Sequence, residues 1–102
     1  MAIRGTTPLW VFTFPFDPAN FQILYLTVTQ GCGTVFEKEL SDLTIDSSAM
    51  TVSYLLTQEE TLSFTAKVPV LIQFRGKDKN GLAWASDILQ DDVNRILKDG
   101  VI

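Results

Sequence analysis

Two segments with a two-residue period flank a turn near the C-terminal end, and this pairing constrains the fold most strongly. The first segment, 68–75, carries apolar side chains at alternate positions: Val68, Val70, Ile72 and Phe74. The second, 82–88, follows Asn80-Gly81, a pair that supplies the positive φ angles of a tight hairpin. A period of two is typical of half-buried β-strands. The chain is therefore predicted to be a small antiparallel β protein.

Further strands with the same period are expected before this hairpin, at 9–14, 23–29, 34–40, 43–45 and 50–55. Prolines break the chain after the first of them, in 15–20, because proline cannot donate to a strand ladder. Glycines allow a turn at 30–33, and the polar connection 46–49 has the length of a hairpin loop. Regular turns between short strands are typical of a β-sandwich.

Helical structure is expected in one short place and is left open in another. Thr57 and Glu60 have the spacing of a capping box, which predicts one helical turn near 57–62. The last stretch, 90–100, allows two interpretations. A helix would place Val93, Ile96 and Leu97 on one stripe, with Gly100 as its stop; alternatively, a final strand begins at Ile88 and runs past Asp92.

These elements predict an all-β, single-domain fold over residues 1–102. We expect an antiparallel immunoglobulin-like β-sandwich of six to eight short strands, with the helical turn near 57–62 and either a short C-terminal helix or a last strand. The chain has a single cysteine, so the disulfide of secreted immunoglobulin domains cannot form within it. A small barrel is the main alternative.

Composition argues against several classes of function. The chain has no histidine, the commonest general base, and one cysteine cannot build a thiolate zinc cluster. The net charge of −4 argues against nucleic acid or an anionic membrane as partner. The N-terminus lacks the apolar region of a secretory signal, so the protein is expected in a cytoplasm.

The residues that could carry chemistry have simpler structural interpretations. Cys32 lies between glycines with no basic residue nearby, and we interpret it as a turn residue. The carboxylate pairs Glu59–Glu60 and Asp91–Asp92 lack the spacing of a calcium loop. We interpret them as helix starts and solvated faces. No catalytic, cofactor-binding or metal-binding residue is predicted, and no small-molecule substrate.

Aromatic residues exceed what one face of each strand must supply, and some are candidates for an interface. The predicted interface residues are Phe14, Phe16, Tyr25, Tyr54 and Trp84. Exposed apolar patches of this kind mark protein interfaces. The alternative is a second small core beneath the loop that begins at Phe14.

Four segments resemble, in the same order, those of small proteins encoded in prophages of Gram-positive bacteria. They are Arg4–Pro8, Phe12–Asp17, Leu56–Phe64 and Ala85–Ile88. The chain is more loosely similar to the immunoglobulin-like N-terminal domain of phage upper baseplate proteins, in which a strand ending in Ser-Asp-Ile is common. The resemblance implies a β-sandwich in a virion or a tail-assembly setting, with no catalytic residues to carry over. The chain departs from the family in 91–94, which is more polar than the strand usually found there.

The expected function is that of a non-enzymatic phage structural or assembly protein, such as a tail, baseplate or neck accessory. Its partners would be other phage tail or baseplate proteins, or further copies of itself. It would reside in the bacterial cytoplasm during assembly and in the virion if incorporated. The alternative is an acidic intracellular binding module that targets a host protein. A small enzyme is the least favoured class, because the chain lacks histidine and an activated cysteine.

Overall fold

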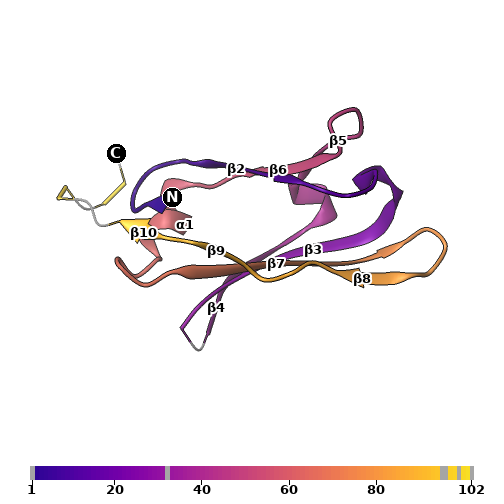
Figure 1. Ribbon diagram of the computed structural model, residues 1–102. Helices are drawn as coiled ribbons and strands as arrows, with labels where there is room; N and C mark the ends of the chain where they lie inside the picture. The colour runs from indigo at the N-terminus through magenta and orange to yellow at the C-terminus, as the bar shows by residue number, and fades with distance from the viewer. Residues whose placement is uncertain (1, 32, 95–96, 99, 102) are drawn as a thin grey trace.

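The strands form two packed layers in the computed structural model, which describes residues 2–31, 33–94, 97–98 and 100–101 (Figure 1). Sheet I has the order β2-β6-β5 and consists of β2 (Leu9–Thr13), β6 (Thr51–Leu55) and β5 (Thr44–Asp46). Sheet II has the order β4-β3-β7-β8, with β9 also paired to β7. Its strands are β4 (Gly33–Glu39), β3 (Phe21–Gln30), β7 (Val70–Asp78), β8 (Ala83–Ala85) and β9 (Leu89–Asp91). Both sheets are antiparallel.

The strand order is that of an immunoglobulin-type sandwich. In the lettering of immunoglobulin domains, sheet I corresponds to B-E-D and sheet II to C′-C-F-G. The two-residue strands β1 (Ala2–Ile3) and β10 (Val93–Asn94) pair in parallel at one end of the sandwich. The predicted all-β sandwich is confirmed, because the described strands of β2–β6–β5 and β4–β3–β7–β8 form two sheets rather than one closed barrel.

Alternation places the apolar side chains between the sheets. In β7, Val70, Ile72 and Phe74 are buried while Leu71 and Arg75 are exposed. Gly76 is the next buried residue of this stripe. Only glycine fits there without a shift of its neighbours, because a Cβ would lie 2.7 Å from the ring of Phe21.

Rings from the two layers meet in the core. The ring centroids of Phe12 in β2 and Phe74 in β7 are 4.8 Å apart, in an edge-on arrangement. Trp10 stacks on Phe64 with centroids 6.4 Å apart. Edge-on and offset aromatic pairs add stabilisation to the area that they bury.

The predicted helical turn is confirmed as α1 (Gln58–Leu62). The hydroxyl of Thr57 accepts a hydrogen bond from the amide of Glu60, and the carboxylate of Glu60 accepts one from the amide of Thr57. Two 3₁₀ turns, η1 (Pro18–Asn20) and η2 (Leu40–Asp42), complete the helical elements of the described residues.

The hairpin between β7 and β8 forms where predicted, but its turn differs from the expected one. Only Gly81 has a positive φ, of 85°, and Asn80 does not. The turn is wider than a two-residue loop, as shown by the hydrogen bond from the amide of Asp78 to the carbonyl of Leu82 at 3.0 Å. The carboxylate of Asp78 accepts the amides of both Asn80 and Leu82 at 2.9 Å, so Asn80 stays in an ordinary conformation.

The C-terminal stretch follows the strand interpretation within the described residues. Leu89–Asp91 and Val93–Asn94 are strands, so a helix does not form there. Val93 is buried, and its carbonyl accepts the amide of Lys67 at 2.8 Å, which ties it to the sandwich. Ile96, part of the alternative helical stripe, lies outside the described residues. The last strand is broken into β8, β9 and β10, and the described residues therefore hold ten strand segments where six to eight strands were predicted.

Candidate functional site

Three of the five predicted interface residues gather in one aromatic cluster at the β7–β8 end of the sandwich. Phe14, Phe16 and Trp84 join Phe21 there, and the centroid distances among the four rings range from 5.3 to 6.0 Å. Phe14 is 4% exposed, so it forms part of a core rather than a surface. Phe16 and Trp84 are half-buried. This arrangement corresponds to the alternative of a small core beneath the loop.

Tyr25 and Tyr54 lie apart from this cluster and from each other. Tyr25 is 37% exposed on the outer face of sheet II, where Arg75 of β7 is its register partner. Tyr54 is half-buried, and its hydroxyl donates to the carboxylate of Glu60. The five residues therefore do not form one continuous patch, and their role in an interface stays a prediction.

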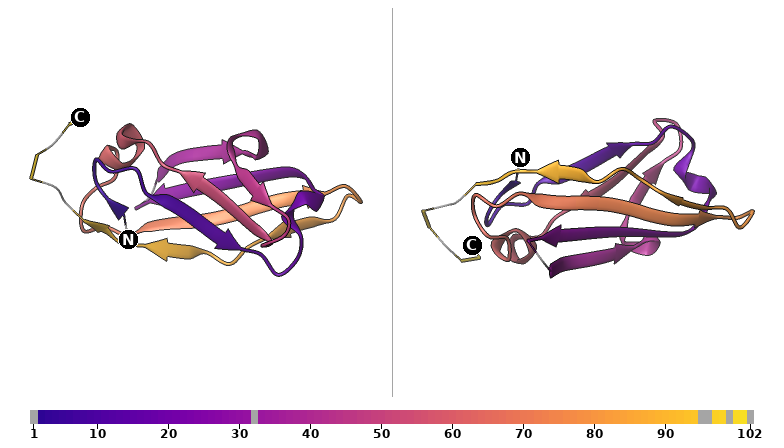
Figure 2. Two further views of the ribbon diagram at one scale, coloured as in Figure 1. Left: turned by 90° about the horizontal axis from the view of Figure 1, so that it is seen from above. Right: turned by 60° about the horizontal axis from the view of Figure 1, so that its bottom comes forward.

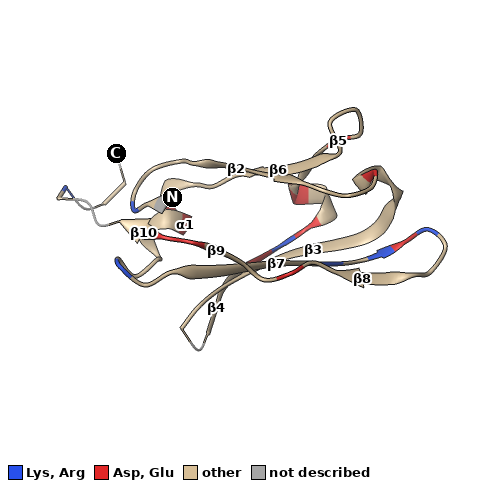
Figure 3. Ribbon diagram, in the orientation of Figure 1, with Lys and Arg blue, Asp and Glu red and all other residues tan. Residues whose placement is uncertain are grey.

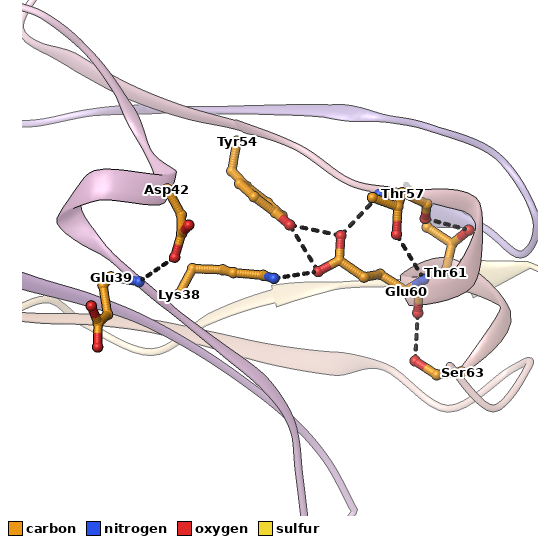
Figure 4. A network of polar contacts seen from close by, with 8 residues as sticks. All are labelled: Lys38, Glu39, Asp42, Tyr54, Thr57, Glu60, Thr61 and Ser63. Atoms are coloured by element: carbon orange, nitrogen blue, oxygen red, sulfur yellow. Dashed lines mark hydrogen bonds and ion pairs between the residues drawn. The ribbon is translucent and has the colours of Figure 1, made fainter.

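A polar network closes the side of the sandwich near α1, and its members come from three elements (Figure 4). Lys38 belongs to β4, Tyr54 to β6 and Glu60 to α1. The carboxylate of Glu60 accepts the hydroxyl of Tyr54 at 2.7 and 2.8 Å and lies 3.2 Å from the ammonium of Lys38. Lys38 also lies 5.6 Å from the centre of the Tyr54 ring, within cation–π range.

The pKa shifts of Lys38, Tyr54 and Glu60 fit a structural role for this network. Burial alone would raise the pKa of Glu60, but hydrogen bonds from the Thr57 amide, Tyr54 and Lys38 outweigh it and lower that pKa. Burial and the bond to Glu60 raise the pKa of Tyr54. Burial would lower the pKa of Lys38, yet the bonds to Glu60 and Tyr54 leave it raised. Each shift moves a pKa away from neutrality, whereas general acid–base catalysis uses a pKa near the working pH.

The other candidates for chemistry take structural places or lie outside the described residues. Cys32 is outside them. The carboxylate of Asp91 accepts the indole N–H of Trp10 at 3.1 Å, while Asp92 and Glu59 are exposed. No cluster of three or more potential metal ligands occurs among the described residues. In the described part of the chain, no helix is long and apolar enough to cross a membrane.

The outer face of sheet I carries exposed apolar side chains that the sequence analysis did not single out. Leu9 and Val11 of β2 are 59% and 56% exposed, and Leu55, the register partner of Leu9, is 59% exposed. Thr13 follows them on β2 and is also exposed. The sequence does contain a sign of this face. The strand β2 has no charged residue, and Leu9 and Val11 alternate with Trp10 and Phe12, which face the core.

A groove opens beside this strand, between the edges of the two sheets. Its volume is about 370 Å³, and it runs from the end of β2 to the connection between β8 and β9. Rings of Phe12, Phe14, Phe74 and Trp84 line it, and Asp87 lies on the opposite rim. The exposed stripe and this groove flank one strand edge, which can hold a protein segment by apolar contact and backbone hydrogen bonding.

Comparisons of this chain with protein-family models, with curated proteins and with solved structures find no match.

Proposed function

We propose that this protein is a non-enzymatic structural or assembly component of a phage particle that acts through protein–protein contacts. The observation that carries the contact role is the exposed apolar stripe of Leu9, Val11 and Leu55 on sheet I. The phage setting, as a tail, baseplate or neck accessory, rests on the resemblance of four segments to small prophage proteins. Subunits of this kind fold in the bacterial cytoplasm and enter the virion on assembly.

The contrast between the two outer faces supports contact through sheet I. The outer face of sheet II mixes exposed apolar side chains, such as Ile23 and Leu71, with charged ones on β4 and β7. The charged ones include Glu37, Glu39, Arg75 and Lys77. The strand β2 carries no charge on either face. Depletion of charge together with exposed apolar side chains distinguishes interface cores from ordinary surface.

The alternative, an acidic module that imitates nucleic acid to bind a host protein, requires carboxylates gathered on one face. Figure 3 shows acidic residues on both sheets and in several connections, with lysine and arginine between them. That distribution favours the assembly role over the acidic module.

The test is incorporation into particles. An affinity-tagged copy would replace the gene in a prophage that encodes the chain, and induced particles would be purified and quantified by mass spectrometry. We expect a fixed number of copies per particle, and loss of incorporation in Val11→Lys. Thr44→Lys is the matched control, because Thr44 is exposed on β5 at the other edge of the same sheet. Absence of the chain from particles and from assembly intermediates would refute the proposal.

A further inference from the structure

The backbone of β2 offers a row of hydrogen-bonding groups at the edge of sheet I. The amide of Phe14 donates to Met50 at 2.8 Å, and the carbonyl of Pro8 accepts from Leu56 at 3.0 Å. These bonds fix the alternation of the antiparallel pair, so the N–H and C=O groups of Leu9, Val11 and Thr13 point away from β6. Within the described part of the chain, no other segment bonds these three residues.

Figure 2 (left) shows β2 at the border of its sheet, with β6 on one side only. The first strand of the chain does not cover this edge, because β1 pairs with β10. Natural sheets protect such edges with charge, proline or a covering segment. The other border strand of sheet I, β5, ends in Asp46, and β4 of sheet II carries Glu37, Lys38 and Glu39. The edge of β2 has no comparable charge.

Side chains on both sides of the edge suit an added strand. A strand beside β2 would direct alternate side chains toward the groove lined by Phe12, Phe14 and Trp84. The intervening side chains would lie beside Leu9 and Val11 on the outer face. Strand addition obtains affinity from backbone hydrogen bonds and selectivity from such alternate pockets.

Charge on the opposite rim indicates the kind of strand that fits. Asp87 lines the groove, and Asp91 and Asp92 follow on the same border of sheet II. Asp91 lies close to β2, because it accepts the indole N–H of Trp10. Two copies joined edge to edge through β2 would bring these carboxylates toward those of the second copy. A basic residue at the flank of an incoming strand would instead complement the carboxylates of Asp87 and Asp92, whereas Asp91 already accepts the indole N–H of Trp10.

We propose that an extended segment of a partner protein, apolar at alternate positions and basic at its flank, adds to β2 as a further strand of sheet I. This inference rests on the proposed assembly function and specifies its contact. The added strand runs antiparallel to β2 and exchanges hydrogen bonds with Leu9, Val11 and Thr13. Its apolar side chains enter the groove between the sheets.

The probe is a capped synthetic peptide of alternating valine and threonine with lysine at both ends. Binding is measured by NMR shifts and by hydrogen exchange of the β2 amides. We expect saturable binding, with slower exchange at Leu9, Val11 and Thr13. Two control peptides have the same sequence with N-methyl groups on alternate amides, one on the odd-numbered and one on the even-numbered amides. We expect the peptide whose methylated amides face β2 to bind at least about tenfold more weakly, because it loses edge hydrogen bonds.

A matched pair of variants tests the same edge from the protein side. Val11→Pro removes an outward N–H that β6 does not use, and we expect at least about tenfold weaker peptide binding. Val11→Thr keeps that N–H and the strand preference, so its affinity should stay close to that of the parent chain. If Val11→Pro does not fold, the N-methylated peptides still decide the question.

Equal binding of all three peptides, no binding of any, or shifts confined to other strands would overturn the inference. Slower exchange of the three amides with rising protein concentration and no peptide would place a second copy on the edge, which also overturns it. Particles that contain the protein although the peptide fails to bind would refute the strand addition alone. Peptide binding without incorporation into particles would refute the assembly function.

Discussion

At the scale of single residues, Gly76 shows how a missing side chain permits the packing of a neighbour. A Cβ at this position would lie 2.7 Å from both the Phe21 ring and the carbonyl oxygen of Ile23. We expect Gly76→Ala to lower the free energy of unfolding by about 1–3 kcal/mol, the usual cost of overpacking. Gly33→Ala is the control, because a Cβ there meets nothing within 4 Å. Equal stability of the two variants in urea would contradict this account.

Glu60 belongs to the same scale, because one carboxylate joins three elements. Glu60→Gln should lower the free energy of unfolding by about 1–2 kcal/mol at neutral pH, as it weakens hydrogen bonds to a charged acceptor. The folded state lowers the pKa of Glu60, so its carboxylate stabilises the fold above the ordinary glutamate pKa and loses this effect as the pH falls. The difference between the parent chain and the variant should therefore shrink below about pH 4.

Denaturant titrations across pH measure this difference, and Glu59→Gln is the matched control. Glu59 is the exposed neighbour of Glu60 on the same helix, and its substitution should change stability little. A Glu60→Gln effect that stays constant down to pH 3 would show that packing, rather than the charge of Glu60, stabilises this network.

At the scale of elements, Thr57 determines where α1 begins. Its hydroxyl accepts the amide of Glu60 at 3.2 Å. Thr57→Ala should cost about 0.5–2 kcal/mol through loss of the cap, and Thr57→Ser should restore most of it. Calorimetry would compare the melting temperatures of the three proteins. A serine variant no more stable than the alanine variant would contradict a capping role.

Local patterns predicted elements well where a few neighbouring residues define the element. Alternation located β2, β3 and β7, and the spacing of Thr57 and Glu60 located α1. Contacts between distant segments could not be predicted, because they depend on which strands become neighbours. Lys38, Tyr54 and Glu60 share no sequence spacing, and they meet only because β4, β6 and α1 converge. Phe14 is a predicted interface residue, but it is buried because the rings of Phe21 and Trp84 pack against it.

The interrupted last strand shows a second limit of local patterns. Its sequence fits both a helical stripe at Val93, Ile96 and Leu97 and the period of a strand. In the described residues, strand pairing of Leu89–Asp91 with β7 and the burial of Val93 decide the conformation. The uncharged edge of β2 was visible in the sequence, but only the sheet order places it at a border.

At the scale of the whole molecule, the two sheets should unfold as one unit, because core rings from both layers interlock. Phe12 of sheet I packs on Phe74 of sheet II, and Trp10 of sheet I bonds to Asp91 of sheet II. Neither sheet can keep its inner face buried without the other. A single cooperative transition is expected for a domain of this size.

The tryptophans allow this cooperativity to be measured, because one lies in each sheet. Trp84→Phe leaves the fluorescence of Trp10 to report on sheet I, and Trp10→Phe leaves Trp84 to report on sheet II. Within each variant, the fluorescence and far-ultraviolet circular dichroism transitions in urea should coincide. Adding Val52→Ala in sheet I or Val28→Ala in sheet II, both fully buried, should lower stability by about 2 kcal/mol and shift both probes together. If Val52→Ala shifted the Trp10 signal but not the Trp84 signal, the sheets would be separate folding units, and contact through sheet I could then order one layer without stabilising the other.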